Sequence, residues 1–352
     1  MSKTDQLPLY ELTRGEFVES IHYGSIAISD NQGRLVAWYG DPHTFTFLRS
    51  SAKPFQALPF IEENGQGFFN LSASEIALIC ASHSGTDKHA ATIQTIQDKT
   101  GVIETELMCG VHPAFDVSTA EAMLKRGDEL TPNRHNCSGK HTGMLAFAHM
   151  RNWSTSDYLD PHHPVQERIL TTFSEMSGVP IDQVAVGIDG CSAPNFAIPL
   201  HNAALAYARL CDPQELSENR ANACRTITTS MTSHPFMVGG PGRFDTRLME
   251  VTDGRMVSKG GAEGYQAIGI LPNALEPGSP ALGIAFKVSD GDLRNRARPA
   301  VALEILRQLN ALSSAEEKEL TEFGPSLPLK NWQEIEIGRA RPAFNLNLIS
   351  PS

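Results

Sequence analysis

The stretch "RSSAKPFQ", residues 49 to 56, places Ser50 three positions ahead of Lys53 and decides how the rest of the chain is interpreted. Residues three apart on a helix share a face, so these two side chains can meet. Pro54 requires this turn to be the first turn of a helix, where a missing N–H costs little. A desolvated lysine there can take a proton from a serine hydroxyl. The pattern is therefore either a nucleophile with its base or a serine cap followed by a solvated lysine.

Two later segments favour the catalytic interpretation. "CASHSG" (80–85) offers Ser82 and Ser84 at the end of an apolar helix, and "VSKGGAEG" (257–264) offers Lys259 on a predicted strand. Ser-x-x-Lys, a serine-bearing loop and Lys-Gly on a strand follow one another in serine β-lactamases and penicillin-binding proteins. A second serine and lysine would relay protons, and the strand backbone could supply an oxyanion donor. Ser84 stands where that superfamily has asparagine, which argues against β-lactam chemistry.

Composition excludes several classes of function. The 352-residue chain has a formal net charge of −11 and scattered basic residues, so it lacks the basic surface that neutralises nucleic-acid phosphates. It has no apolar run of about 20 residues that could cross a bilayer. The N-terminal residues lack the apolar core of a secretion signal, and the predicted location is the cytoplasm. Six cysteines without a CxxC pair argue against a disulfide framework.

The pattern of apolar residues predicts strands near both ends of the chain. "SIHYGSIAISDNQGRLVAWYG" (20–40) indicates two strands around a turn, and "PALGIAFKVSDGD" (280–292) indicates a buried strand. Helices are predicted between them, including "NFAIPLHNAALAYARLCD" (195–212), and a final long one follows at "RPAVALEILRQLNAL" (298–312). We expect an α/β fold, an α+β sandwich in which a sheet of N- and C-terminal segments is covered by helices.

The same pattern indicates one interdependent catalytic unit. We place this unit at residues 8–345, followed by a tail at 346–352. A helical subdomain within it is expected over about residues 60–235. The Gly-Pro-rich segment "HPFMVGGPGRFDTRL" (234–248) is predicted to be a mobile or tightly turning loop.

Two further segments carry candidate metal ligands. "NRHNCSGKHTGML" (133–145) brings Cys137 and Lys140 together ahead of a helix, and "GIDGCSAPNFA" (187–197) places Cys191 in a loop ahead of another. A thiolate is favoured near a helix N-terminus. Two such thiols and a nitrogen donor can hold zinc, with water as the fourth ligand. Structural cysteines are the other open interpretation, because the spacing carries no metal signature and lysine is a rare ligand.

Eight blocks of sequence, in order, resemble the thermolabile, asparaginase II-like family of L-asparaginases. They are "RGEFVESIHYGSIAI", "FLRSSAKPFQALPF", "ICASHSGTDKH", "CGVHP", "HNCSGKHTGMLA", "DGCSAPNFAIPL", "MVGGPGRFDT" and "KGGAEG". The resemblance runs from residue 14 to residue 345 and so covers nearly the whole chain. It implies a fold like that of serine β-lactamases, penicillin-binding proteins and glutaminases, a homodimer, and hydrolysis of L-asparagine to L-aspartate and ammonia.

The resemblance also assigns expected roles to individual residues. Ser50 corresponds to the nucleophile and Lys53 to its activating base, while Ser82 and Lys259 correspond to a second Ser-Lys pair. The zinc ligands, for one ion per chain, would be Cys137, Lys140 and Cys191. We further expect Arg49 or His141 to pair with the α-carboxylate of the substrate, since a guanidinium fork suits a carboxylate.

Three alternatives stay open at this point. A glutaminase or another small-amide hydrolase differs from an asparaginase by one methylene in the substrate pocket. An enzyme acting on β-lactams or D-Ala peptides would need the missing Ser-x-Asn element. A non-catalytic, zinc-dependent binding protein on the same scaffold would tolerate the loss of Ser50 or Lys53, yet both are present.

Overall fold

The computed structural model describes residues 6–349, which divide into two compact units. Unit 1 contains the described residues of 1–51, 198–212 and 251–352. Unit 2 contains Ala52–Ala197 and Pro213–Glu250. The division of the chain into one unit at 8–345 with an internal helical subdomain stays a prediction. No described helix is both long and apolar enough to cross a membrane.

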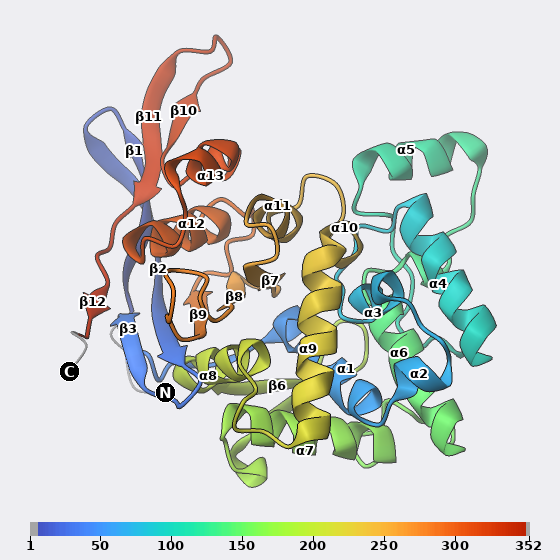
Figure 1. Ribbon diagram of the computed structural model, residues 1–352. Coiled ribbons are helices and arrows are strands. Elements are labelled where there is room, and N and C mark those ends of the chain that lie inside the picture. Colours follow the sequence, from blue (N-terminus) through green and yellow to red (C-terminus); the bar gives the residue numbers. More distant parts are fainter. Residues whose placement is uncertain (1–5, 350–352) are drawn as a thin grey trace. The chain divides into compact units, whose positions relative to one another are not determined.

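Unit 1 is built on an antiparallel sheet whose strands come from both ends of the chain, which confirms the predicted α/β fold class. Its order is β10-β11-β1-β2-β9-β8-β7, and β3 pairs with β2 and with β12 (Figure 1). The strands are β1 (Leu7–Arg14), β2 (Phe17–Asp30), β3 (Leu35–Tyr39), β7 (Met256–Gly260), β8 (Tyr265–Ile270), β9 (Leu282–Val288), β10 (Leu327–Lys330), β11 (Glu336–Pro342) and β12 (Asn347–Leu348). The short strand β4 (Phe45–Phe47) also belongs to unit 1 but lies outside this sheet.

One face of this sheet carries small side chains where a helix packs closely. Gly283 pairs with Ser29 on one side and with Gly269 on the other. A Cβ atom at Gly283 would lie 1.8 Å from the carbonyl oxygen of Ala204 in α8 (Leu200–Cys211). Only glycine fits there, so α8 can lie directly on the backbone of β8 and β9.

The opposite face carries larger apolar side chains beneath α12 (Arg298–Gln308). Ile268 and Ile284 pair on this face and are fully buried. The side chain of Gln266, on the same face, accepts a hydrogen bond from Arg298 of α12. A short helix, α13 (Ser314–Glu319), follows α12. The alternation of small and large residues along each strand therefore separates the two helix-covered faces.

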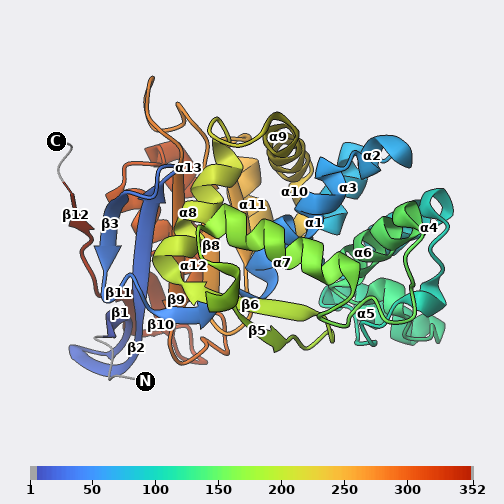
Figure 2. The same cartoon turned by 90° about the horizontal axis from the view of Figure 1, so that it is seen from below.

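Unit 2 is mostly helical. Its central helix, α1 (Lys53–Glu62), is buried at nine positions and packs against α6, α7 and α9. Helices α1, α3 and α6 lie side by side (Figure 2). The helices are α1, α2 (Gly65–Phe68), α3 (Ala73–Ile79), α4 (Asp87–Thr100), α5 (Val117–Arg126), α6 (Ser138–Arg151), α7 (Pro164–Ser177), α9 (Glu218–Ser233), α10 (Pro235–Val238) and α11 (Phe244–Val251).

The predicted helix over residues 195–212 is wrong in its first part. Pro194–Pro199 forms strand β6, which pairs with β5 (Ala185–Ile188), and the helix begins at Leu200. The buried residues of β6 belong to a sheet, and this pairing outweighs their local helical preference. Cys191 consequently lies in the turn of a β-hairpin rather than ahead of a helix.

Two further predictions differ from the structure in part. The predicted loop at 234–248 is mostly helical, in α10 and α11, and only residues 239–243 connect them. The predicted tail contains β12, which pairs with β3, while residues 350–352 lie outside the described part of the chain.

Candidate active site

Ser50 lies in a 3-10 turn, Arg49–Ala52, that directly precedes α1. The helix itself begins at Lys53, so Ser50 is not on its first α-helical turn as the sequence predicted. Arg49 adopts a φ of 52°, a left-handed conformation that is strained for a residue with a side chain. Such strain is common beside reacting groups, and here it immediately precedes the predicted nucleophile.

Hydrogen bonds fasten this turn to β7 and to α8 within unit 1. The Ser51 hydroxyl donates to the carbonyl oxygen of Lys259 at 2.6 Å, and Tyr207 donates to the carbonyl oxygen of Ser51 at 2.7 Å. Ser50 is half-buried next to this fully buried anchor. Ser51 therefore has a structural role. Its bond to the carbonyl of Lys259 on β7 also fixes the backbone next to Ser50.

Lys259 lies on β7, as the sequence predicts, opposite Ala267 on β8. Its side chain is 1% exposed, and Nζ donates to the carbonyl oxygen of Gly260 at 2.8 Å. A lysine that is this deeply buried has lost most of its hydration, which is the environment that makes an amine reactive. The pairing of Ser82 with Lys259 and that of Ser50 with Lys53 remain predictions.

Lys53 is buried in unit 2 among three oxygen atoms. Its Nζ lies 2.9 Å from Ser82 Oγ, 2.5 Å from the carbonyl oxygen of Ala81 and 3.2 Å from that of Asn136. The Lys53 side chain is 1% exposed, which excludes the solvated lysine that the sequence left open. Two predicted catalytic residues, Lys53 and Ser82, are thus in direct contact.

The loop after α3 holds Ser82 in position. Its backbone N–H donates to the carbonyl oxygen of Val238 at 3.0 Å, and the Ser84 hydroxyl donates to that of Gly239 at 2.8 Å. Gly240 has a φ of 116°, and a Cβ atom there would lie 2.7 Å from Ser84 Oγ, so this close approach requires glycine. Ser84 therefore fastens two loops together.

The three predicted zinc ligands converge in unit 2. Cys137 precedes α6, Lys140 lies in its first turn, and Lys140 Nζ is 3.0 Å from Cys191 Sγ. All three side chains are at most 5% exposed. A hydrogen bond with Cys191, together with the charges of Lys53 and Lys140, holds the pKa of Cys137 well below its ordinary value despite burial. Burial lowers the pKa of Lys140, but the thiolate charges of Cys191 and Cys137 outweigh this and raise it.

His141 adjoins this cluster and is fully buried. Tyr158 accepts a hydrogen bond from the N–H of Met108 at 3.0 Å and lies 2.6 Å from His141 Nδ1. A phenol oxygen that already accepts one hydrogen bond is suited to donate its proton to Nδ1, which leaves the ring proton on Nε2. Among the described residues, the partner left for Nε2 is Cys191, with which the His141 side chain makes a weak hydrogen bond. Burial lowers the pKa of His141 to about 4, while nearby Cys191 opposes this shift.

Two of the three predicted zinc ligands, the thiols of Cys137 and Cys191, suit a thiophilic metal ion. Thiolate is the form of cysteine that binds metals, and Cys137 is a thiol whose pKa is lowered. Among residues 6–349, no group of three or more His, Cys, Asp or Glu side chains is arranged to hold a metal ion. A zinc site here would therefore require the amine of Lys140 as a ligand, which must lose a proton first.

Sequence reasoning did not identify all parts of this site. The carbonyl groups of Ala81 and Asn136 contact Lys53, but backbone atoms carry no signal in residue type. Cys109 is buried near the two thiols, and burial followed by the charges of Cys137 and Cys191 raises its pKa to about 12. The block "CGVHP", which begins at this cysteine, was the available signal.

Arg49 lies beside the sheet of unit 1. Burial lowers the pKa of Lys287, and the nearby charge of Arg49 contributes to that shift. The role of Arg49 in binding a substrate carboxylate stays a prediction.

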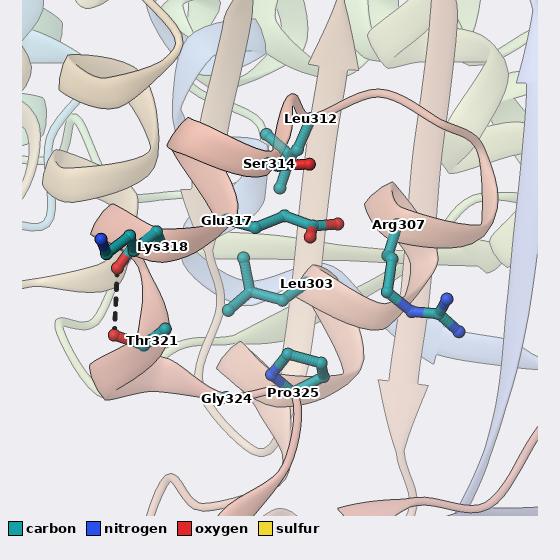
Figure 3. A pocket seen from close by; sticks show the side chains of 9 residues that line it. All are labelled: Leu303, Arg307, Leu312, Ser314, Glu317, Lys318, Thr321, Gly324 and Pro325. Carbon is teal, nitrogen blue, oxygen red and sulfur yellow. Dashed lines mark hydrogen bonds between the residues drawn. The ribbon is translucent and has the colours of Figure 1, made fainter.

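A cavity of 310 Å³ lies elsewhere in unit 1, between α12 and α13 (Figure 3). Apolar groups of Leu303, Leu312 and Pro325 line it together with the charged side chains of Arg307 and Glu317. No residue predicted for catalysis or metal binding lines this cavity, so it has no part in the reaction considered below.

Comparisons with known proteins give the family. The chain is similar over part of its fold to two solved structures described as glutaminases. A probable glutaminase from Bacillus subtilis in complex with 6-diazo-5-oxo-L-norleucine is 12% identical, with 82% of this chain and 84% of that chain covered and a TM-score of 0.38. A Bacillus glutaminase is 11% identical, with 85% and 89% covered and a TM-score of 0.33. No curated protein sequence matches the chain. The family model described as L-asparaginase II matches residues 10–342, and the chain belongs to this family of amidohydrolases.

Proposed function

We propose that the protein is an L-asparaginase that hydrolyses L-asparagine to L-aspartate and ammonia through serine and lysine side chains. The observation that carries the proposal is the buried amine of Lys53, 2.9 Å from the hydroxyl of Ser82 and held by two carbonyl groups. Membership of the L-asparaginase II family directs this amide chemistry towards a small amino-acid amide.

The surroundings of Lys53 suit a group that moves a proton in both directions. A neutral amine has two N–H bonds and one lone pair, and the carbonyl oxygens of Ala81 and Asn136 accept from the two N–H bonds. The lone pair then faces Ser82 Oγ and can accept the hydroxyl proton. In the ammonium form the same position is a third N–H bond, which can deliver the proton to the amide nitrogen of the tetrahedral intermediate so that it leaves as ammonia.

Ser50 is the proposed nucleophile. Lys53, which contacts the Ser82 hydroxyl, would act as its base through that hydroxyl, and Lys259 would be the second lysine of the proton relay. Attack on the amide carbonyl would form a tetrahedral oxyanion and then an acyl-enzyme, which water hydrolyses. Lys259 is a buried amine on a strand, and in its protonated form it can stabilise developing negative charge. Substrate recognition requires a donor for the α-carboxylate, and Arg49 and the Nε2–H of His141 are the candidates.

A zinc ion, one per chain, would be held by Cys137, Lys140 and Cys191. It would supply a Lewis acid that binds and orients an oxygen atom of the substrate. His141 is next to the proposed zinc ligands, and its Nε2–H could donate a hydrogen bond to the substrate that the zinc ion would bind. These residues would position the substrate, while the serines and lysines would carry out the proton transfers.

Ammonia release separates asparaginase from its rivals. Purified protein should release ammonia from L-asparagine faster than from L-glutamine and should not open a chromogenic cephalosporin. Ser50→Ala should abolish turnover, whereas Ser74→Ala, a half-buried serine on α3, should leave it unchanged. Faster release from glutamine would make the protein a glutaminase. Wild-type turnover by Ser50→Ala would reject Ser50 as the nucleophile.

The metal and the oligomer need separate measurements. Elemental analysis should find one zinc per chain in the wild-type protein and in Ser50→Ala, and much less in Cys191→Ala. Undiminished zinc in Cys191→Ala would reject the proposed ligand set. Homodimerisation and a cytoplasmic location are further proposals. Light scattering of a homodimer should give twice the chain mass of 38.3 kDa, and any other mass would reject the dimer.

A further inference from the structure

The block "CGVHP" (109–113) has no role in the proposed reaction, yet one of its residues contacts the segment that surrounds Lys53. His112 is half-buried, and its Nδ1 lies 2.6 Å from the carbonyl oxygen of Pro113. A carbonyl only accepts, so Nδ1 carries the ring proton and Nε2 is left as an acceptor. The tautomer of His112 is thus set by its own neighbour in the chain.

The Nε2 atom of His112 meets the backbone of Asn136. The N–H of Asn136 donates to it at 3.1 Å, and Oδ1 of Asn136 lies 3.2 Å from the same nitrogen. Since two acceptors repel, an unprotonated Nε2 requires the side-chain amide of Asn136 to present its NH2 group there. The carbonyl of this residue is one of the two that accept from Lys53 Nζ. His112 therefore holds the backbone N–H of Asn136, and the carbonyl of the same residue helps to orient the Lys53 amine.

Aromatic contacts keep the imidazole of His112 in place. It stacks on Phe115 with ring centroids 4.4 Å apart and planes inclined by 8°, and its centroid lies 4.3 Å from that of His135. His135 in turn accepts a hydrogen bond at Nδ1 from the N–H of Cys137 at 3.0 Å. Two imidazole rings in contact therefore hold successive backbone N–H groups, one on each side of the Asn136 carbonyl.

We propose that His112 is a positioning residue for the Lys53–Ser82 pair, acting through the backbone of Asn136. The inference rests on the proposed amide hydrolysis, because it concerns the orientation of the lysine that moves the proton. With both carbonyl groups in place, the lone pair of Lys53 faces Ser82. Without the hold of His112, the peptide group of the Asn136 carbonyl is held only by the bond of the Cys137 N–H to His135, so the carbonyl can tilt and its bond to the Lys53 amine is weakened.

Substitution of His112 by Gln or by Asn, whose side-chain amides differ in length by one methylene group, tests this role. Gln can bring its side-chain oxygen to the position of Nε2, whereas Asn reaches only that of Nδ1. We expect His112→Asn and His112→Ala to lower kcat for asparagine on the order of 10- to 100-fold, with KM and zinc content unchanged. His112→Gln should restore most of the lost kcat. His149→Ala removes another half-buried histidine of unit 2 and should behave as the wild type.

Thermal melting of each variant separates positioning from folding. A merely structural role would lower the melting temperature and leave kcat of the folded fraction unchanged, which would overturn the inference. Equal kcat in His112→Asn, His112→Gln and wild type would overturn it as well. If His112→Ala does not fold, the comparison of Asn with Gln still decides the question.

Failure of the proposed function would be recognised independently. If the wild type releases no ammonia from any amide, that function is wrong, and crystal structures then test the inference without activity. His112→Asn should show the Asn136 carbonyl displaced from Lys53 Nζ, whereas a contact that remains at the wild-type 3.2 Å would overturn the inference.

Discussion

The close contact between α6 and α3 gives a sharp prediction for Gly139→Ala. A Cβ atom at Gly139 would lie 2.0 Å from the carbonyl oxygen of Leu78, and ordinary contact begins at 3.4 Å. Since the obstructing atom belongs to the backbone, the two helices must move apart by about 1.4 Å along that line. Overpacking of this kind costs about 1–3 kcal/mol or more, and the better helix propensity of alanine returns at most about 1 kcal/mol. We expect a net loss of about 2 kcal/mol.

The same displacement should impair catalysis. Lys140 follows Gly139 on α6, and Ser82 lies just beyond the end of α3, so separation of the helices misplaces both groups. A shift of about 1 Å at a reacting pair can cost about 100-fold in rate. Urea unfolding at about pH 7 would give the loss of stability as a lower midpoint at unchanged slope. Ammonia release would give the change in kcat.

Gly143→Ala is the matched control, in the same helix and against the same neighbour. Its Cβ atom would meet Cγ2 of Ile79 at 2.6 Å, and a side-chain methyl group can move aside where a carbonyl cannot. We expect it to cost clearly less than Gly139→Ala. The reasoning from backbone contact would be refuted if Gly139→Ala were as stable as the wild type, or if Gly143→Ala were the less stable of the two variants.

Two other predictions concern stability. Burial lowers the pKa of His89 from 6.5 to about 4 in the folded protein. As the pH falls, the imidazole therefore takes up a proton in the unfolded chain before it does so in the folded one. The stability that neutral His89 provides is present above pH 6.5 and is lost as the pH falls towards 4. Between about pH 7 and pH 5, urea unfolding should show a loss about 2 kcal/mol larger in the wild type than in His89→Gln, and an equal loss in both proteins would contradict this. Ser51→Ala removes the buried bond to the Lys259 carbonyl and should cost about 1–3 kcal/mol in the same assay, whereas a change below about 0.5 kcal/mol would show that the bond contributes little.

Local sequence patterns predicted much of the fold. The alternation of apolar residues over 20–40 identified β2 and β3. Ser72 caps α3 together with Glu75 three residues later, which is also a local pattern. Gly127 ends α5 in a left-handed conformation, as glycine after a helix commonly does. These features depend on neighbours in the chain, which is why the sequence alone indicates them.

The failures lie where distant contacts outweigh local preference. "NFAIPL" has a helix-like apolar content, but its pairing with β5 makes it a strand, and Cys191 moves into a hairpin turn as a result. The contact of Lys53 with Asn136 joins residues 83 positions apart through a carbonyl group. No residue type records such a backbone contact, so neither periodicity nor motif spacing could reveal it.

The sheet of unit 1 has a consequence for the synthesis of the chain. Tyr10 on β1 pairs with Pro342 on β11, so the β1–β2 hairpin leaves the ribosome more than 300 residues before its last partner strand. During that interval both edges of the hairpin are open to pairing with other nascent chains. We therefore expect soluble yield to fall with slower translation and to rise at lower temperature, which weakens hydrophobic association, and a chain that stops before Glu336 to aggregate.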